Sequence, residues 1–112
     1  IKQVLINLLM NAQHATGNKG TIVIGTAYDA DNGRVQIRIR DDGYGIEKEN
    51  LSRIFDPFFT TKPTGEGTGL GLAVSYGIVQ SHSGQIEVSS QPGQGTEFTI
   101  TLPMLTGDEE LE

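Results

Sequence analysis

The sequence predicts one α+β domain, a two-layer sandwich in which helices cover one face of a mixed, mainly antiparallel sheet. Two observations predict this class. Helical patterns open and later interrupt a series of segments in which apolar and polar residues alternate. Those segments come in two pairs, each joined by a short turn that contains glycine, so the paired strands are expected to run antiparallel. Because each strand has one apolar and one polar face, only one face of the sheet needs helices to cover it.

The opening helix is expected over residues 2–15. Its apolar side chains recur at intervals of three and four residues, which is typical of a helix with one buried face. Gly17 follows as a stop signal. The recurring apolar residues are Val4, Leu5, Leu8, Leu9 and Ala12.

The first pair of strands is expected over residues 21–27 and 34–40. An Asn-Gly pair in the turn between them suits the positive φ angles of a tight hairpin. Alternation places Ile22 and Ile24 together on the buried face of the first strand.

After this hairpin, a short helix is expected over residues 47–54 and a loop over 55–68, where prolines and glycines interrupt any period. A second long helix is expected over 69–82. The second pair of strands follows over 85–90 and 96–102, joined by a turn with Pro and Gly.

Composition limits the classes of function. The chain has 112 residues, enough for one ordinary core, and 8 Lys and Arg against 14 Asp and Glu give a net charge of −6. This balance argues against nucleic acid or an anionic membrane surface as a partner. There are no cysteines, which excludes disulfides and thiolate metal sites, and no apolar run long enough for a membrane span.

Residues 1–103 are expected to form the domain, and residues 104–112 an acidic, frayed tail. The final Leu111-Glu112 pair resembles a remnant of an expression vector. The first residues already follow the helical pattern without an N-cap, so we expect the domain to be excised from a longer protein.

A glycine-rich run leads directly into the second long helix. Glycines let the backbone approach a ligand closely, and the N-terminus of a helix offers free N–H groups and the positive end of the dipole, which suits phosphates. Close helix packing or a hinge explains the same glycines equally well. Neither a P-loop nor a dinucleotide-binding turn fits the spacing. The run reads Gly67-Thr68-Gly69-Leu70-Gly71-Leu72.

An acid pair, Asp41-Asp42, ends the second strand. A buried carboxylate there accepts a hydrogen bond from the amino group of adenine and repels the carbonyl that guanine has at that place. Taken alone, the pair fits a solvent-exposed Asp-Gly turn better.

Two amides, Asn7 and Asn11, lie four residues apart and so share a face of the opening helix. Amide oxygens suit Mg²⁺, which takes few protein ligands together with phosphates and waters. Hydrogen bonds to buried backbone groups are an equally good explanation of both residues.

In this order, the elements resemble the ATP-binding catalytic domain of sensor histidine kinases. That domain belongs to the Bergerat-fold superfamily, which also includes gyrase, heat-shock chaperones and a mismatch-repair ATPase. Five family motifs cover nearly the whole chain, and the third is most similar to the nitrogen-regulation type of sensor kinase. They are the N box (3–12), the DxGxG box (41–45), the F box (54–62), the second glycine box (67–72) and the closing GxGTxF (93–98).

The resemblance implies ATP and Mg²⁺ as ligands and assigns the residues that bind them. Asn11 is the implied Mg²⁺ ligand, and Asn7 faces the same phosphates. Asp41 is implied to bind the adenine amine. The residues that line the base or let its loop close are Gly43, Gly45, Ile46 and Thr96.

The phosphate side is implied to lie at the second glycine box, with residues 55–68 as the ATP lid. Lys62 is expected to reach the γ-phosphate, although a solvated lysine fits nearly as well. The other residues implied here are Gly67, Thr68, Gly69 and Gly71, with Leu70 and Leu72 packed beneath, and Phe55, Phe58 and Phe59 as anchors of the lid or contacts to a partner domain.

The chain departs from the family at two histidines. Where many members carry Lys or Arg three residues after the metal-binding Asn, this chain has His14. A histidine there makes a weaker, pH-dependent phosphate contact, and a surface histidine explains it as well. His82, near the end of the second long helix, is expected to be structural and not the phosphoacceptor.

The ATPases of the superfamily carry a glutamate four residues before the metal-binding Asn, and here that place holds Asn7. An amide cannot take a proton from water, so hydrolysis is expected to be slow. The resemblance implies transfer of the γ-phosphoryl group to a histidine on a separate dimerisation domain, and then to an aspartate of a response regulator.

The same resemblance implies a bacterial, cytoplasmic location, tethered to a membrane through segments outside this chain. Two other classes of function stay open: a nucleotide-sensing module without phosphotransfer, and another superfamily member, a serine kinase or an ATPase.

The family normally has a further strand and helical turn before Gln3. Without them, a bare sheet edge is expected to favour self-association.

Overall fold

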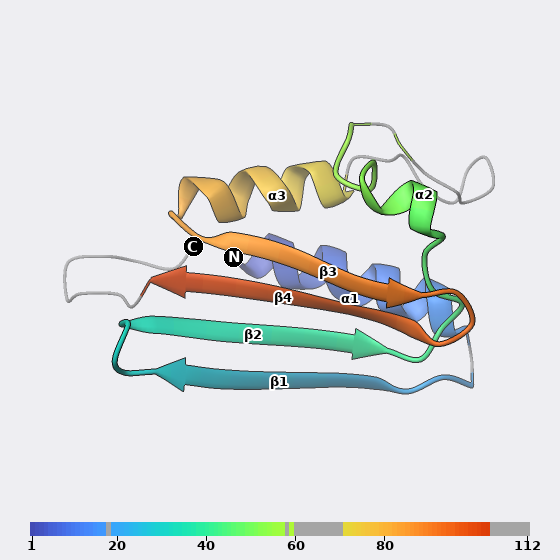
Figure 1. Cartoon of the computed structure of the whole chain (residues 1–112), viewed down its shortest axis with the longest axis horizontal. Helices are drawn as coiled ribbons and strands as arrows, with labels where there is room; N and C mark the ends of the chain where they lie inside the picture. The colour runs from blue at the N-terminus through green and yellow to red at the C-terminus, as the bar shows by residue number, and fades with distance from the viewer. Residues whose placement is uncertain (18, 58, 60–70, 104–112) are drawn as a thin grey trace.

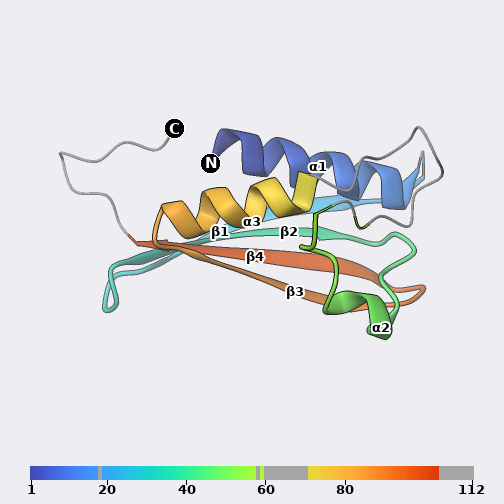
Figure 2. The ribbon, with the colours of Figure 1, turned by 90° about the horizontal axis from the view of Figure 1, so that it is seen from above.

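The computed structural model describes residues 1–17, 19–57, 59 and 71–103. They form two layers, a four-stranded sheet and a pair of helices that both lie on one of its faces (Figures 1 and 2). The helices are α1 (Lys2–Thr16) and α3 (Gly71–Ser81), and the short α2 (Lys48–Leu51) lies at one end of the sheet. The α+β sandwich predicted from the sequence is thereby confirmed.

The sheet contains β1 (Ile22–Asp29), β2 (Arg34–Asp41), β3 (Gln85–Gln91) and β4 (Gly95–Pro103). Their spatial order is β1-β2-β4-β3, and all three pairings are antiparallel. The prediction of a mainly antiparallel sheet is therefore correct. Because α3 crosses between the two hairpins, the last strand returns to the centre and pairs with the second.

The core lies between the helices and the inner face of the sheet. In α1 the fully buried apolar residues are Val4 and Leu8, at the spacing that the sequence pattern predicts. They meet the inner side chains of the two central strands and of α3. Those side chains are 5% exposed or less, namely Ile39, Phe98, Ile100, Leu102 and Val79.

Each long helix ends at a local stop. The N–H of Gly17, which has a φ angle of 64°, donates to the carbonyl of Gln13 at 3.0 Å. At the end of α3, Nδ1 of His82 lies 2.9 Å from the carbonyl oxygen of Ile78. The backbone N–H of His82 and Oγ of Ser81 donate to the same carbonyl, at 3.2 and 2.7 Å. His82 thus belongs to the hydrogen-bonded end of the helix, which agrees with the structural role expected for it.

The outer strand β1 differs from the sequence prediction. Ile24 lies on the helix-covered face, opposite the buried Ile39, but is 55% exposed. Since α1 packs mainly over β2, β1 extends beyond the layer of helices. Alternation therefore predicted the correct face but not its burial. No helix in the described part of the chain is both long and apolar enough to cross a bilayer.

Three segments that are distant in sequence come together at one end of the molecule. They are the C-terminal end of β2, the turn between β3 and β4, and the last turn of α1 (Figure 1). The antiparallel register causes this, because Asp41, the last residue of β2, lies opposite Thr96, near the start of β4.

Candidate functional site

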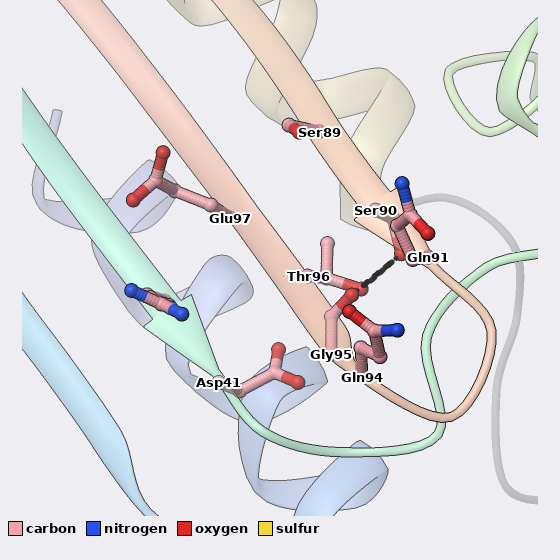
Figure 3. Close-up of a pocket in the computed structure, with 9 residues that line it drawn as sticks. Asp41, Ser89, Ser90, Gln91, Gln94, Gly95, Thr96 and Glu97 are labelled. Carbon is pink, nitrogen blue, oxygen red and sulfur yellow. Dashed lines mark hydrogen bonds between the residues drawn. The ribbon is translucent and has the colours of Figure 1, made fainter.

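A buried carboxylate marks this end of the sheet. Asp41 is 6% exposed, and its register partner Thr96 is also 6% exposed. Both side chains lie on the face that the helices cover, because they alternate with exposed Arg40 and half-buried Glu97. Figure 3 shows Asp41 beside the Gly95–Thr96 segment of β4. A buried acceptor of this kind can discriminate between ligands by their donors.

The hydrogen bonds around Asp41 compensate only part of the cost of burying its carboxylate. Its Oδ1 accepts a hydrogen bond from the N–H of Gly43 at 2.9 Å. Burial raises the pKa of Asp41, while the backbone N–H groups of Gly43 and Thr96 oppose the rise and the charge of Asp42 adds to it. The carboxylate is therefore less solvated than in water, and a ligand donor that reaches it restores part of the lost solvation.

The side chain of Thr96 is oriented by hydrogen bonds through Ser90, called here the hydroxyl relay. Oγ of Ser90 donates to the carbonyl of Gly95 at 2.8 Å and accepts from the N–H of Ile46 at 2.8 Å. It also lies 2.8 Å from Oγ1 of Thr96. Since Ser90 has one proton and donates it to Gly95, the proton between the two hydroxyls comes from Thr96. Thr96 thus keeps acceptor lone pairs next to Asp41.

Ser90 is not among the site residues that the sequence predicts. The signal was present, since Ser90 is polar at an inward position of an alternating strand, two residues after Val88. A polar side chain at such a position needs partners inside the protein.

An open hollow of about 210 Å³ lies at the joined ends of β2, β3 and β4. Asp41, Ser90 and Thr96 contribute to its lining, with Ser89, Gln94 and Glu97 around them (Figure 3). Arg40 also lines it. Because Arg40, Ser89 and Glu97 belong to the outer face of the sheet, the hollow is lined from both faces at the strand ends.

Two glycines of the predicted nucleotide loop are required by protein packing. A Cβ on Gly43 would lie 2.5 Å from the carbonyl oxygen of Ala15 at the end of α1. Gly45 has a φ angle of 78°, and a Cβ there would lie 2.2 Å from the carbonyl oxygen of Gln91. The loop after Asp41 is thus wedged between α1 and the β3–β4 turn. The role that the family resemblance implies for these glycines, letting the loop close on a base, stays a prediction.

The second acid of the pair has a structural partner. Oδ1 of Asp42 accepts a hydrogen bond from the N–H of Thr21 at 2.8 Å, which ties the loop to the start of β1. The two neighbouring acids therefore have different roles, because only Asp41 is buried beside Thr96.

His14 lies in the last turn of α1 and contacts Tyr44 edge to face, with 6.2 Å between ring centroids. Both residues are exposed. Partial burial, and then the charge of Asp41, raise the pKa of the Tyr44 phenol. Residue 14 therefore lies beside the loop of the candidate site, and its expected phosphate contact stays a prediction.

The paired amides of α1 have different surroundings. Nδ2 of Asn7 donates to the carbonyl of Gly71 and to Oγ of Ser75, both at 3.1 Å, so its amide faces α3. Asn11 is half-buried one turn later. Asn7 is thus bonded to the first turn of α3, and the role of Asn11 as a magnesium ligand stays a prediction.

Part of the predicted phosphate side lies outside the described residues. This applies to Lys62, Gly67, Thr68, Gly69, Leu70 and Phe58. Gly71 is the first residue of α3, and Leu72 packs against the core as expected. The backbone N–H of Ile46 belongs to the Ser90 relay, and its side chain is partly buried against the core.

Aromatic side chains join the start of the predicted lid to the domain. The ring of Phe55 lies 5.3 Å from that of Tyr76 and 6.5 Å from that of Phe98, measured between centroids. The guanidinium of Arg53 lies 4.7 Å from the ring centroid of Phe59. Phe55 is therefore an anchor to the core and to α3, one of the two roles expected for it.

An antiparallel sheet backed by two helices, with an amide-bearing helix and a buried acid converging at one end, defines a class of ATP-binding α+β domain. The profile of the family described as histidine kinase-, DNA gyrase B- and HSP90-like ATPases matches residues 1–106. The chain belongs to this family.

Its relatives are sensor kinases. The chain is 46% identical over 104 residues to the sensor histidine kinase ZraS of Klebsiella oxytoca, covering 93% of this chain and 22% of the relative. Among solved structures, the catalytic domain of the histidine kinase ThkA in a nucleotide-free form aligns with a TM-score of 0.78 and 39% identity, over 91% of this chain and 64% of that one. Full-length ShkA in complex with AMPPNP aligns with a TM-score of 0.82 and 32% identity, over 95% of this chain and 22% of that one.

The chain thus spans less than a quarter of the length of the relative ZraS. These similarities confirm that it is an ATP-binding domain of the histidine kinase type.

Proposed function

We propose that the domain binds Mg²⁺–ATP and donates the γ-phosphoryl group to a histidine on a separate dimerisation domain of the same sensor kinase. The observation that carries this proposal is the buried Asp41 carboxylate beside Thr96, in a chain of the histidine kinase family. The acceptor aspartate of a response regulator would receive the group next.

Asp41 and Thr96 select the base. Both offer acceptors, and the adenine amine has two protons to donate, whereas guanine has a carbonyl at that position. A carbonyl against a buried carboxylate leaves two acceptors facing each other without a proton between them. The domain is therefore expected to prefer ATP to GTP.

The residues of α1 fit a magnesium ion by their chemistry. Asn11 supplies one neutral amide oxygen, and Mg²⁺ takes few protein ligands when phosphates and waters complete its shell. When bound, the ion neutralises phosphate charge. The protein's own task is to hold Asn11, Asp41 and the start of α3 in one arrangement.

Phosphoryl transfer to a histidine requires mainly that the two reacting groups are aligned, and little acid–base or covalent catalysis by protein side chains. A ring nitrogen of the acceptor attacks the γ-phosphorus, the bond to the β–γ bridging oxygen breaks, and ADP leaves with that electron pair. In the place of the superfamily's catalytic glutamate, this chain has Asn7, whose NH₂ group is bonded to Gly71 and Ser75. No base for water is present at that position, which favours a donor over a hydrolase.

The proposal includes a bacterial cytoplasmic location, tethered to a membrane through other segments, as in membrane-bound sensor kinases.

The proposal also includes self-association through β1. This edge strand exposes Val23, Ile24 and Tyr28 by 55%, 55% and 61%. It has no charged residue before Asp29, and charges are a usual protection of strand edges.

Calorimetric titration of the chain with ATP and Mg²⁺, beside GTP and Mg²⁺, tests nucleotide binding. Equal affinity for both would contradict the role of Asp41. A second assay supplies the matching histidine domain and radiolabelled ATP. Labelled histidine domain supports the kinase, whereas tight ATP binding without label on that domain supports a nucleotide-sensing module.

A further inference from the structure

A buried hydroxyl lies in the first half of α3, outside the nucleotide site assigned above. Ser75 is 0% exposed, although most of its neighbours in the core are aliphatic. Its Oγ donates to the carbonyl of Gly71 at 2.8 Å and accepts from Nδ2 of Asn7 at 3.1 Å. Nδ2 of Asn7 also donates to the carbonyl of Gly71 at 3.1 Å. The three residues form a closed triangle, called here the α1–α3 clamp.

The chemistry of the groups determines how the clamp is oriented. A backbone carbonyl only accepts, so the side of the Asn7 amide that faces Gly71 must be its NH₂ group. The opposite side, Oδ1, accepts from Nε2 of Gln3 at 2.9 Å. Both protons of the Asn7 amide are therefore used on α3, and turning the amide over would place two oxygens against each other.

The clamp lies at a direct contact between the two helices. A Cβ on Gly71 would lie 3.8 Å from Cγ of Asn7, so the side chain is in contact with the backbone of α3. Gly71 is the first residue of α3, and Asn7 is one turn before Asn11. The clamp thus joins the element that carries the implied metal ligand to the N-terminus of the helix that follows the glycine box.

We propose that Ser75 is a positioning residue for the triphosphate: through the clamp with Asn7 and Gly71, it sets the start of α3 relative to α1. This inference rests on the proposed ATP-binding function and adds a residue to it. Ser75 touches no phosphate. It acts because the first N–H groups of α3 have no partner within the helix, and their direction follows the helix axis that the clamp holds.

The test compares two ligands, ATP with Mg²⁺ and adenosine, which has the base but no phosphates. In Ser75→Ala, affinity for ATP should fall about five- to tenfold, as expected for the loss of a buried hydrogen bond. Affinity for adenosine should stay unchanged, because Asp41 and Thr96 lie at the end of the sheet. Both affinities are measured by calorimetry at a temperature well below the unfolding midpoint. A loss of stability alone then does not alter the ratio of the ATP affinity to the adenosine affinity.

Ser81→Ala is the matched control. Oγ of Ser81 donates to the carbonyl of Ile78 at 2.7 Å, an exposed bond to the backbone at the other end of the same helix. The ratio of ATP affinity to adenosine affinity in Ser81→Ala should equal that of the wild type. If Ser75→Ala does not fold, Ser75→Cys keeps the side-chain shape with only a weak donor, and its ratio should fall in the same direction.

A double-mutant cycle with Asn7→Ala shows whether Ser75 acts through Asn7. The double variant should bind ATP no more weakly than the weaker single variant, because either change opens the clamp. Additive losses, or an unchanged ATP-to-adenosine ratio in folded Ser75→Ala, would overturn the inference. If the wild-type chain binds no ATP, the proposed function itself fails, which is a separate outcome.

Discussion

Asp41 and Thr96 face each other across β2 and β4, both buried, with acceptor groups side by side at the open end of the sheet. The proton of Thr96 is directed to Ser90, so this end of the inner face offers acceptors to a ligand and not donors. That polarity matches the amine of adenine. It also means that the orientation of the Thr96 hydroxyl depends on Ser90.

Asp41→Asn should weaken ATP binding about tenfold, since the variant loses a charged acceptor at a buried position. Calorimetry with ATP and Mg²⁺ measures the change. Asp42→Asn is the control, because the Asp42 carboxylate is bonded to the N–H of Thr21. A loss of affinity in Asp42→Asn equal to that in Asp41→Asn would show that general negative charge, and not the buried acceptor, determines binding.

Asp41→Asn should also stabilise the nucleotide-free domain against unfolding. Burial raises the pKa of Asp41 in the folded state, so the folded state binds more protons than the unfolded state between the two pKa values. The free energy of unfolding of the wild type therefore falls as the pH rises through that window. Asp41→Asn should show a higher unfolding midpoint at neutral pH, by up to a few °C, and the difference should shrink in mild acid. A lower midpoint for Asp41→Asn at neutral pH would contradict this.

Ser90→Ala should reduce both stability and ATP affinity. The N–H of Ile46 loses its acceptor and Thr96 loses the partner that orients its proton, so a cost of about 1–2 kcal/mol in unfolding free energy is expected. Chemical denaturation and calorimetry measure the two effects. Ser89→Ala changes the exposed outer-face neighbour, which also lines the hollow, and should leave the unfolding free energy unaltered. Unchanged stability in Ser90→Ala would contradict the role of the relay.

Steady hydrolysis of ATP by the pure chain should be slow. Asn7 has no proton-accepting group and its NH₂ is held by Gly71 and Ser75, so water at this position has no base. Phosphate release under steady-state conditions measures it. Rapid turnover that survives further purification would refute the argument from Asn7.

The chain should associate as its concentration rises, through the edge of β1. Ile24→Lys places a charge on this edge and should shift the mass measured by light scattering toward the monomer. Glu87→Lys changes a charged position on the opposite edge strand, β3, and should have no such effect. A wild-type chain that is a clean monomer at high concentration would exclude this role for β1.

Much of this architecture follows from local patterns. Val4 and Leu8 recur at helical spacing and are buried, and Asn-Gly and Pro-Gly turns close the two hairpins, because periodicity and turn chemistry act over a few residues. The N box and the acid of the DxGxG box indicated the nucleotide site through their joint order. The exposure of Ile24 was not predictable, since it depends on how far the layer of helices reaches.

The sequence by itself determined the element order, the strand faces and the family, since all three are written in neighbouring residues and ordered motifs. Only the tertiary structure decided which polar groups act together. Asn7 and Ser75 are 68 positions apart, and the partners that satisfy a buried amide or hydroxyl come from other elements once the chain is packed. For the same reason Ser90, an ordinary strand residue in the sequence, holds Thr96 in the fold.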